Sequence, residues 1–365
     1  MFNHLWKIIV GSKHLLAAAL ITVSLSAIAN NENKSEVYQY LELISGTKGI
    51  GAREAGTAEE KKTADFIVNT FRSMGYHPIK QTFTFGLLQD SANIIVDSAP
   101  DAKKTIILAA HYDSTAANKG SLGAIDNGAG VAAMLAIAKN IAQLNTQPSI
   151  NIRFIAFGAE ENGLKGSKHY VKQLTQQPEE RSQVIGMINF DTIAGGDITY
   201  VHSAHTSPYK CATDDITFNS ETIIRDALLT ASEKKLGNQH KYTIHPAYPG
   251  YPEGVTGEWS DHAPFACAGI PIAYVESTNF TINGEDGFDG YSQTTHSETW
   301  DCFEQSTKTA CQREDEKQWG KMWHTKFDQL DTINRLFPGR LARQLSQNVT
   351  VLTEVLSKPE LYLTR

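Results

Sequence analysis

Four short motifs place acidic residues or a histidine beside small and turn-forming residues. Along the chain they are AAHYD with His111 and Asp113, GAIDNGAG with Asp126, GAEENG with Glu160 and Glu161, and INFDTIAG with Asp191. A single pair of acids is usually a solvated turn, and an aspartate before a helix is usually a cap. Together, one imidazole and several carboxylates point to a common site. Carboxylates so crowded would raise one another's pKa, and bound cations are the simplest remedy.

Imidazole and carboxylate ligands suit zinc, with manganese or cobalt as substitutes. Two zinc ions that share one carboxylate would lie about 3.5–4 Å apart, as in two-metal hydrolytic sites. Water bound to such ions has its pKa lowered from roughly 15.7 toward 7, so hydroxide is available at neutral pH. One carboxylate must stay off the metals to transfer protons, a role typically worth about 10²–10⁴-fold in rate.

The segments around these motifs alternate between strand and helix patterns. Strands are predicted over 103–113, 150–158 and 183–191, and helices over 126–144 and 166–177. Asn127 is placed to cap the first of these helices. Consecutive strand–helix units bring the carboxyl ends of their strands to one edge of a sheet. We therefore expect the motifs to meet at that edge.

The flanking segments complete one α/β domain. Thr57 to Glu60 resembles a capping box that opens a helix ending near Met74. Further strands are predicted over 77–85, 92–98, 198–203 and 271–277, the first two antiparallel, with a closing helix over 336–356. The stretches near 203–257 and 278–322 are predicted to be long, irregular covers. We expect residues 30–365 to form a single domain with a mixed, mostly parallel sheet and helices on both faces.

In their order and spacing, the four motifs resemble those of the dizinc aminopeptidases of clan MH, a group that includes secreted bacterial leucine aminopeptidases. WSDHAPFACAGIPIAYVES at 259–277 resembles the SDHxPFxxxGIP segment of that family, and REAGT at 53–57 resembles its RxxGT element. The resemblance extends from Arg53 to Arg340. It implies the zinc exopeptidase fold and removal of the N-terminal residue from peptides or proteins by a metal-bound hydroxide.

The resemblance also implies a role for each residue of the motifs. The implied ligands are His111 and Asp191 at one zinc ion, Glu161 and a C-terminal histidine at the other, and Asp126 as the bridge. Glu160 would be the general base. Asp113 would orient His111 without touching a metal. A cis peptide bond between Asp126 and Asn127 is also implied.

Two histidines compete for the last ligand position. His296 lies in TTHSETWD, and His324 lies in KMWHTKFDQLDTI. We favour His324 because Thr325 and Asp328 can orient its loop and because the resemblance places the ligand just before the closing helix. His296 instead precedes a segment without a counterpart in the family. The residue before the ligand is Trp323, where the family sometimes has a tyrosine that stabilises the oxyanion, so this help would have to come from the indole N–H or another group.

The sequence gives less information about which N-terminal residue the enzyme would remove. Residues 251–291, with FPGR at 337–340, resemble family members that remove a basic N-terminal residue. The acids that could line such a pocket are Glu253, Glu258, Glu276 and Asp286, and the alternative is that they are ordinary surface acids. We expect Trp323, Glu276 and Tyr251 to contact the substrate.

Three other functions are alternatives. HYDS and WHTKFD also resemble the motifs of glutaminyl cyclases, which share this fold and use one zinc ion, but those enzymes resemble DSAxP where this chain has DNGAG. A carboxypeptidase of the same clan is a weaker alternative. A catalytically inactive ectodomain would not need a complete ligand set.

The N-terminus has the pattern of a signal peptide. Lys7 and Lys13 precede an apolar run that ends at Ala27-Ile28-Ala29, so we expect cleavage after Ala29 and a periplasmic or secreted product. Loss of this acid-free segment changes the formal net charge from −7 to −9. This charge argues against nucleic acid and anionic membranes as partners. We expect a monomer with no stable membrane insertion.

The four cysteines would enter an oxidising compartment, where they can form disulfides. Cys302 and Cys311 flank a short polar loop and are the favoured pair. Cys211 and Cys267 would then form the second disulfide. Three connectivities are open in principle.

Overall fold

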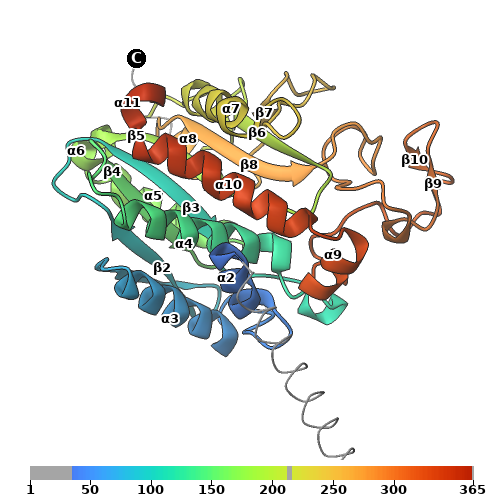
Figure 1. Cartoon of the computed structure of the whole chain (residues 1–365), viewed down its shortest axis with the longest axis horizontal. Helices are drawn as coiled ribbons and strands as arrows, with labels where there is room; N and C mark the ends of the chain where they lie inside the picture. The colour runs from blue at the N-terminus through green and yellow to red at the C-terminus, as the bar shows by residue number, and fades with distance from the viewer. Residues whose placement is uncertain (1–34, 212–215, 364–365) are drawn as a thin grey trace, which may run out of the picture.

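The computed structural model describes residues 35–211 and 216–363, and it is shown in Figure 1. The predicted signal peptide, residues 1–29, lies outside the described residues. Within the described ranges, no helix is both long enough and apolar enough to cross a membrane.

A mixed sheet of eight strands forms the centre of the protein (Figure 1), in the order β1-β2-β4-β3-β5-β8-β6-β7. The strands are β1 (Ile79–Phe85), β2 (Gln89–Asp97), β3 (Thr105–His111), β4 (Asn151–Phe157), β5 (Val184–Phe190), β6 (Ile198–Ala204), β7 (Val255–Thr256) and β8 (Ile272–Thr278). The central strands β4, β3, β5 and β8 are parallel. β1 pairs antiparallel with β2, β2 with β4, and β6 with β8, whereas the short strand β7 is parallel to β6. The predicted single α/β domain is confirmed.

Helices cover both faces of this sheet because its central strands are apolar on both sides. In β3, Ile106 and Leu108 face one core, and Ile107 and Ala109 face the other. The larger core packs against α2 (Glu36–Ser45), α3 (Ala58–Ser73), α4 (Ala129–Ala142), α7 (Ile223–Leu236) and α10 (Arg340–Ser357). The smaller core packs against α5 (Lys165–Thr175) and α8 (His262–Cys267). Short helices α6 (Pro178–Gln183), α9 (Leu330–Leu336) and α11 (Pro359–Tyr362) complete the fold.

The helix ends follow the predicted capping chemistry. The Thr57 side chain accepts a hydrogen bond from the backbone N–H of Glu60, and the Glu60 carboxylate accepts one from the N–H of Gly56. The Asn127 side chain accepts a hydrogen bond from the N–H of Gly130, which fixes the start of α4. The second contact holds the backbone directly after Asp126 in a defined position.

The closing helix differs from the prediction. It was expected from residue 336, but α9 ends there and α10 begins only at Arg340. Pro338 lacks an N–H group, and Gly339 has a φ of +74°, so the chain turns between the two helices.

The first of the two predicted irregular covers is partly wrong. Residues 203–257 include the 14-residue helix α7, which places Ile224, Ala227 and Leu228 against the main core. The helix was missed because its apolar stripe is narrow and interrupted by polar residues. The second cover, 278–322, is mostly irregular as expected, with a short turn η3 (Ser297–Thr299) and the two-residue strands β9 (Phe303–Glu304) and β10 (Thr309–Ala310).

Both favoured disulfides are present. Cys302 and Cys311 are joined across β9 and β10. Cys211 and Cys267 join the segment after β6 to the end of α8.

Candidate metal centre and active site

The carboxyl ends of the parallel strands bring the acidic motifs together, as their positions predicted. His111 is the last residue of β3, Glu160 and Glu161 follow β4, and Asp191 follows β5. Asp126 lies in the short helical turn η2 (Ala124–Gly128) that leads into α4. These segments are far apart in sequence, and only the parallel pairing of β4, β3 and β5 makes their ends neighbours.

Two groups of ligand atoms share one aspartate. In the first, His111 Nε2 lies 3.2 Å from Asp126 Oδ1 and 3.4 Å from Asp191 Oδ1. In the second, His324 Nε2 lies 3.0 Å from Asp126 Oδ2 and 3.0 Å from Glu161 Oε1. Within each group, one ligand atom per residue lies within 4.8 Å of the others. Asp126 therefore presents one carboxylate oxygen to each group.

His296 lies outside both groups. Its ring packs against Phe337, and its Nδ1 accepts a hydrogen bond from the backbone N–H of Glu298. His296 caps the turn η3, whereas His324 lies in the loop before α9. Of the two competing histidines, the fold brings His324 to Glu161 and Asp126.

The ionisation of these groups fits a cation site. Burial and the charge of Asp126 raise the pKa of Glu161 to about 7, and burial raises the pKa of Glu160 well above its usual range. Against the effect of burial, hydrogen bonds to Asp126 and Glu161 raise the pKa of His324 to about 10. Without a metal ion, the converging acids and the histidine therefore hold protons that a bound cation would replace. Imidazole nitrogens and carboxylate oxygens are ligands that zinc accepts. The donor set and its spacing fit zinc.

The carboxylate of Asp113 makes contacts that the sequence did not predict. Its two carboxylate oxygens accept hydrogen bonds from the backbone N–H groups of Glu160, at 3.0 Å, and Glu161, at 3.1 Å. Toward His111, its backbone carbonyl lies 3.2 Å from Nδ1 and its carboxylate lies 3.6 Å away. The expected contact with His111 is therefore made mainly by the carbonyl. The carboxylate instead holds the turn that carries both glutamates.

Arg53 supports the loop before Asp126. It is fully buried, and its guanidinium donates hydrogen bonds to the carbonyls of Tyr112, Leu122 and Gly123. The sequence contains the RxxGT element, but the residues next to Arg53 do not indicate which groups its side chain contacts. Arg53 ties the end of β3 to the loop that delivers Asp126.

Asp328 links the two ligand-bearing loops. Its carboxylate accepts hydrogen bonds from the backbone N–H of Ile125 and the hydroxyl of Ser121. Residue 328 was expected to orient the loop of His324, and the fold shows that it also holds the backbone beside Asp126.

Ser260, which was not predicted, donates a hydrogen bond to Asp191 Oδ2 at 2.8 Å.

Several residues of this site have unusual backbone geometry. The bond between Asp126 and Asn127 is cis, as the resemblance implied. Ala159, Thr192 and His324 have left-handed backbone angles, with φ of +53°, +51° and +58°. Residues other than glycine rarely adopt this conformation outside turns and functional sites.

A cavity of about 670 Å³ opens over the metal-ligand groups. Its wall includes all three residues expected to contact the substrate, Trp323, Glu276 and Tyr251. Asp286 lines it as proposed, and Asp289 is an additional acid of the same wall. The expectation for Glu253 is not met because its side chain is exposed and does not line the cavity, and Glu258 lines a different cavity.

Glu276 is less available than its position suggests. One of its carboxylate oxygens lies 2.8 Å from His202 Nε2. Burial and the charge of Asp191 raise the pKa of Glu276 to about 8, while burial and Arg225 lower the pKa of His202 to about 3. Asp286 and Asp289 are therefore the acids of the wall that a charged substrate can reach most directly.

The fold and the paired histidine–carboxylate groups define an α/β metallohydrolase with its centre at the carboxyl edge of the sheet. Residues 93–349 match the sequence profile of peptidase family M28, and the chain belongs to this family. The family resemblance inferred from the motifs is confirmed.

Individual relatives agree with this assignment. The chain is 27% identical over 317 residues to the alkaline phosphatase isozyme conversion protein of Escherichia coli, covering 80% of this chain and 81% of that protein. Among solved structures, its fold is similar to BSAP, a zinc aminopeptidase from Bacillus subtilis, with a TM-score of 0.60, 18% identity and coverage of 90% and 95%. A glutaminyl cyclase from Porphyromonas gingivalis is similar at a TM-score of 0.59, 19% identity and coverage of 89% and 99%.

Proposed function

We propose that this protein is an exported aminopeptidase that holds two zinc ions. The observation that carries the proposal is the carboxylate of Asp126, whose oxygens face separate histidines. His111 and Asp191 would complete one site, and Glu161 and His324 the other. When bound, zinc polarises the scissile carbonyl and lowers the pKa of bound water. The predicted signal peptide and the two disulfides support export.

The residues of the chain would perform the proton transfers and the positioning. Glu160 is buried beside the ligand groups without belonging to either, and Asp113 fixes its backbone. A carboxylate oxygen of Glu160 would accept a proton from the attacking water and return it to the nitrogen of the departing peptide. Burial raises the pKa of Glu160, which favours its holding that proton.

The cavity of 670 Å³ would receive the N-terminal residue of the substrate. Its aromatic wall, with Tyr248, Tyr251 and Trp323, can pack against a long aliphatic stem, and Asp286 and Asp289 can meet a positive charge. This lining supports a preference for arginine or lysine at the substrate N-terminus.

A single assay series tests the proposed activity. We expect purified mature protein to contain about two zinc ions per chain and to hydrolyse the arylamides of arginine, lysine and leucine. Removal of zinc by a chelator should abolish turnover, and added zinc should restore it. Equal or faster turnover of the leucine substrate would overturn the preference for basic residues.

The same series separates the enzyme from a glutaminyl cyclase, to which the fold is also similar. One zinc ion per chain and cyclisation of N-terminal glutamine, without arylamide hydrolysis, would indicate the cyclase. Neither metal nor turnover would indicate an inactive relative.

Replacement of the two competing histidines should give opposite results. We expect His324→Ala to lose one of two zinc ions and at least about 100-fold in kcat/KM, because Asp126 and Glu161 would lose their shared nitrogen ligand. His296→Ala is the matched control and should keep both ions. Metal analysis and arylamide kinetics measure both outcomes, and full zinc content in His324→Ala would contradict the assignment.

A further inference from the structure

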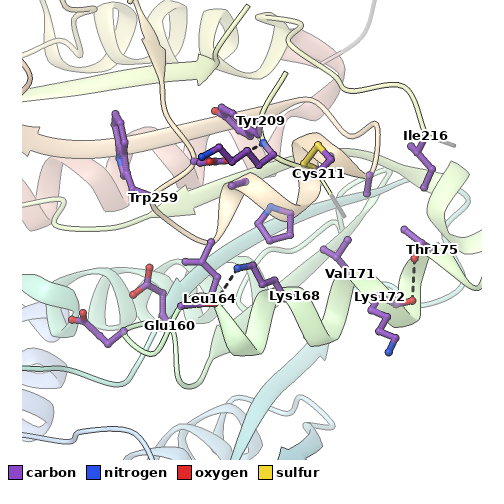
Figure 2. Close-up of a pocket in the computed structure, with 18 residues that line it drawn as sticks. Glu160, Leu164, Lys168, Val171, Lys172, Thr175, Tyr209, Cys211, Ile216 and Trp259 are labelled. Carbon is purple, nitrogen blue, oxygen red and sulfur yellow. Dashed lines mark hydrogen bonds between the residues drawn. A yellow bond between two sulfur atoms is a disulfide. The ribbon is translucent and has the colours of Figure 1, made fainter. Parts of the chain in front are cut away.

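A second cavity, of about 920 Å³, begins at Glu160 and Glu161 and is lined by residues that do not line the cavity over the metal-ligand groups, such as Lys168, Val171 and Tyr209. Figure 2 shows that it runs along α5, from Glu160 and Leu164 at one end to Thr175 and Ile216 at the other. We call it the α5 groove. The segment around Tyr209 and the Cys211–Cys267 disulfide form the facing wall.

The α5 groove is continuous with the proposed active site. It shares Glu160, Glu161 and Trp259 with the cavity over the ligand groups, but it does not include the other proposed metal ligands. Trp259 lines both cavities and is 47% exposed. The two cavities therefore meet at Glu160.

The chemistry of an aminopeptidase assigns different roles to two such cavities. In the substrate, only one residue lies on the N-terminal side of the bond that breaks, and the cavity over the metal-ligand groups is large enough to hold that residue. The rest of the substrate continues on the other side. Because Glu160 would return a proton to the departing nitrogen, the departing chain must leave from the Glu160 side, where the α5 groove begins.

We propose that the α5 groove binds the departing part of peptide substrates and favours acidic residues there. The inference rests on the proposed aminopeptidase function and adds a substrate class to it. Three lysines line the groove, namely Lys168, Lys172 and Lys210, although the protein as a whole has a formal net charge of −7. Such a local concentration of positive charge complements carboxylates on a peptide.

The lysines remain free to meet a substrate. Lys172 and Lys210 are exposed, and the ammonium of Lys168 donates one hydrogen bond to the carbonyl of Gly163 at 3.2 Å. Glu258 is an opposing charge in the groove outside the Glu160–Glu161 pair, and its carboxylate accepts a hydrogen bond from the backbone N–H of Lys210. Among the described residues that line the groove beyond Glu160 and Glu161, three lysines are therefore accompanied by one glutamate.

The dimensions of the α5 groove suit an extended chain. Helix α5 has 11 residues, which gives a length of roughly 16 Å at 1.5 Å per residue. An extended peptide advances about 3.3 Å per residue, so roughly five residues fit. Leu164, Val171 and Pro264 supply apolar surface for alternate side chains. Acidic residues at the fourth and fifth positions of the substrate should then lie near Lys168 and Lys172.

The test uses six-residue peptides that share the N-terminal residue giving the fastest arylamide turnover. They continue as Ala-Ala-Glu-Glu-Ala, Ala-Ala-Gln-Gln-Ala or Ala-Ala-Lys-Lys-Ala. We expect kcat/KM to be about 5–20-fold higher for the Glu-Glu peptide than for the Lys-Lys peptide at low salt, with the difference shrinking as salt is added. Lys168→Gln/Lys172→Gln should reduce the difference to about twofold or less, and Lys168→Glu/Lys172→Glu should reverse it. Arylamide turnover should be unchanged in both variants because that substrate does not reach the lysines.

A double variant on another helix controls for overall charge. Lys61→Gln/Lys62→Gln removes two exposed lysines from α3, which covers the opposite face of the sheet, and it should keep the preference for Glu-Glu. An equal loss of preference in this control would overturn the proposal. So would equal rates for all three peptides in an enzyme that hydrolyses arylamides. Absence of arylamide hydrolysis in the wild-type protein would instead refute the underlying function.

Discussion

Replacing Glu160 by glutamine should lower kcat by about 10²–10⁴-fold while the protein keeps its zinc and its fold. The amide has nearly the same shape as the carboxylate, but it cannot accept a proton. Glu160 belongs to neither ligand group, and its backbone N–H remains bonded to Asp113 in the variant. KM should therefore change little, since binding and proton transfer depend on different groups. Arylamide kinetics give kcat and KM, and metal analysis of the same preparation gives the zinc content.

Glu253→Gln is the matched control for this change. Glu253 is exposed and lines neither cavity, so removal of its charge should leave kcat within about twofold. A Glu160→Gln enzyme that loses affinity for substrate but keeps its kcat would exclude Glu160 as the proton carrier. Loss of zinc in that variant would instead make Glu160 a ligand.

Replacing Asp126 by alanine should remove both metal ions and lower activity below detection. Its two oxygens face His111 and His324 separately, so one substitution takes a ligand from each group. The stability of the wild-type protein should also depend on zinc, because a ligand at about 100 times its Kd stabilises the folded state by about 2.7 kcal/mol. A chelator should therefore lower the Tm of the wild-type protein and leave the Tm of Asp126→Ala unchanged.

Asp286→Ala tests whether this result is specific to the bridge. Asp286 is an aspartate of the same cavity but belongs to neither ligand group, so the variant should retain both ions and respond to the chelator like the wild-type protein. An Asp126→Ala protein that still binds two zinc ions would refute the shared ligand.

The sequence by itself determined the seven longer strands, β1 to β6 and β8, their order along the chain and the acids at their ends, whereas the two-residue strands β7, β9 and β10 were not predicted. This was possible because these features depend on short patterns. A buried strand such as β3 requires a continuous apolar run, and Asp126, Glu161 and Asp191 lie within a few residues of the elements that carry them. Family resemblance then implied a role for each residue and favoured His324 over His296.

Only the tertiary structure decided how those residues are supported. The carboxylate of Asp113 reaches the backbone of Glu160, and Arg53 reaches the loop at Leu122, across 47 and 69 residues of sequence. Nothing local distinguishes such contacts from those of a surface charge, because they exist only once strands and loops pack against one another. The pairing of Glu276 with His202 likewise exists only in the folded chain. Helix α7 was not predicted because its few apolar residues are recognisable as a buried face only once they pack against the core. The α5 groove likewise arises from segments that meet only in the folded chain, where the Cys211–Cys267 disulfide and the lysines of α5 line the same cavity.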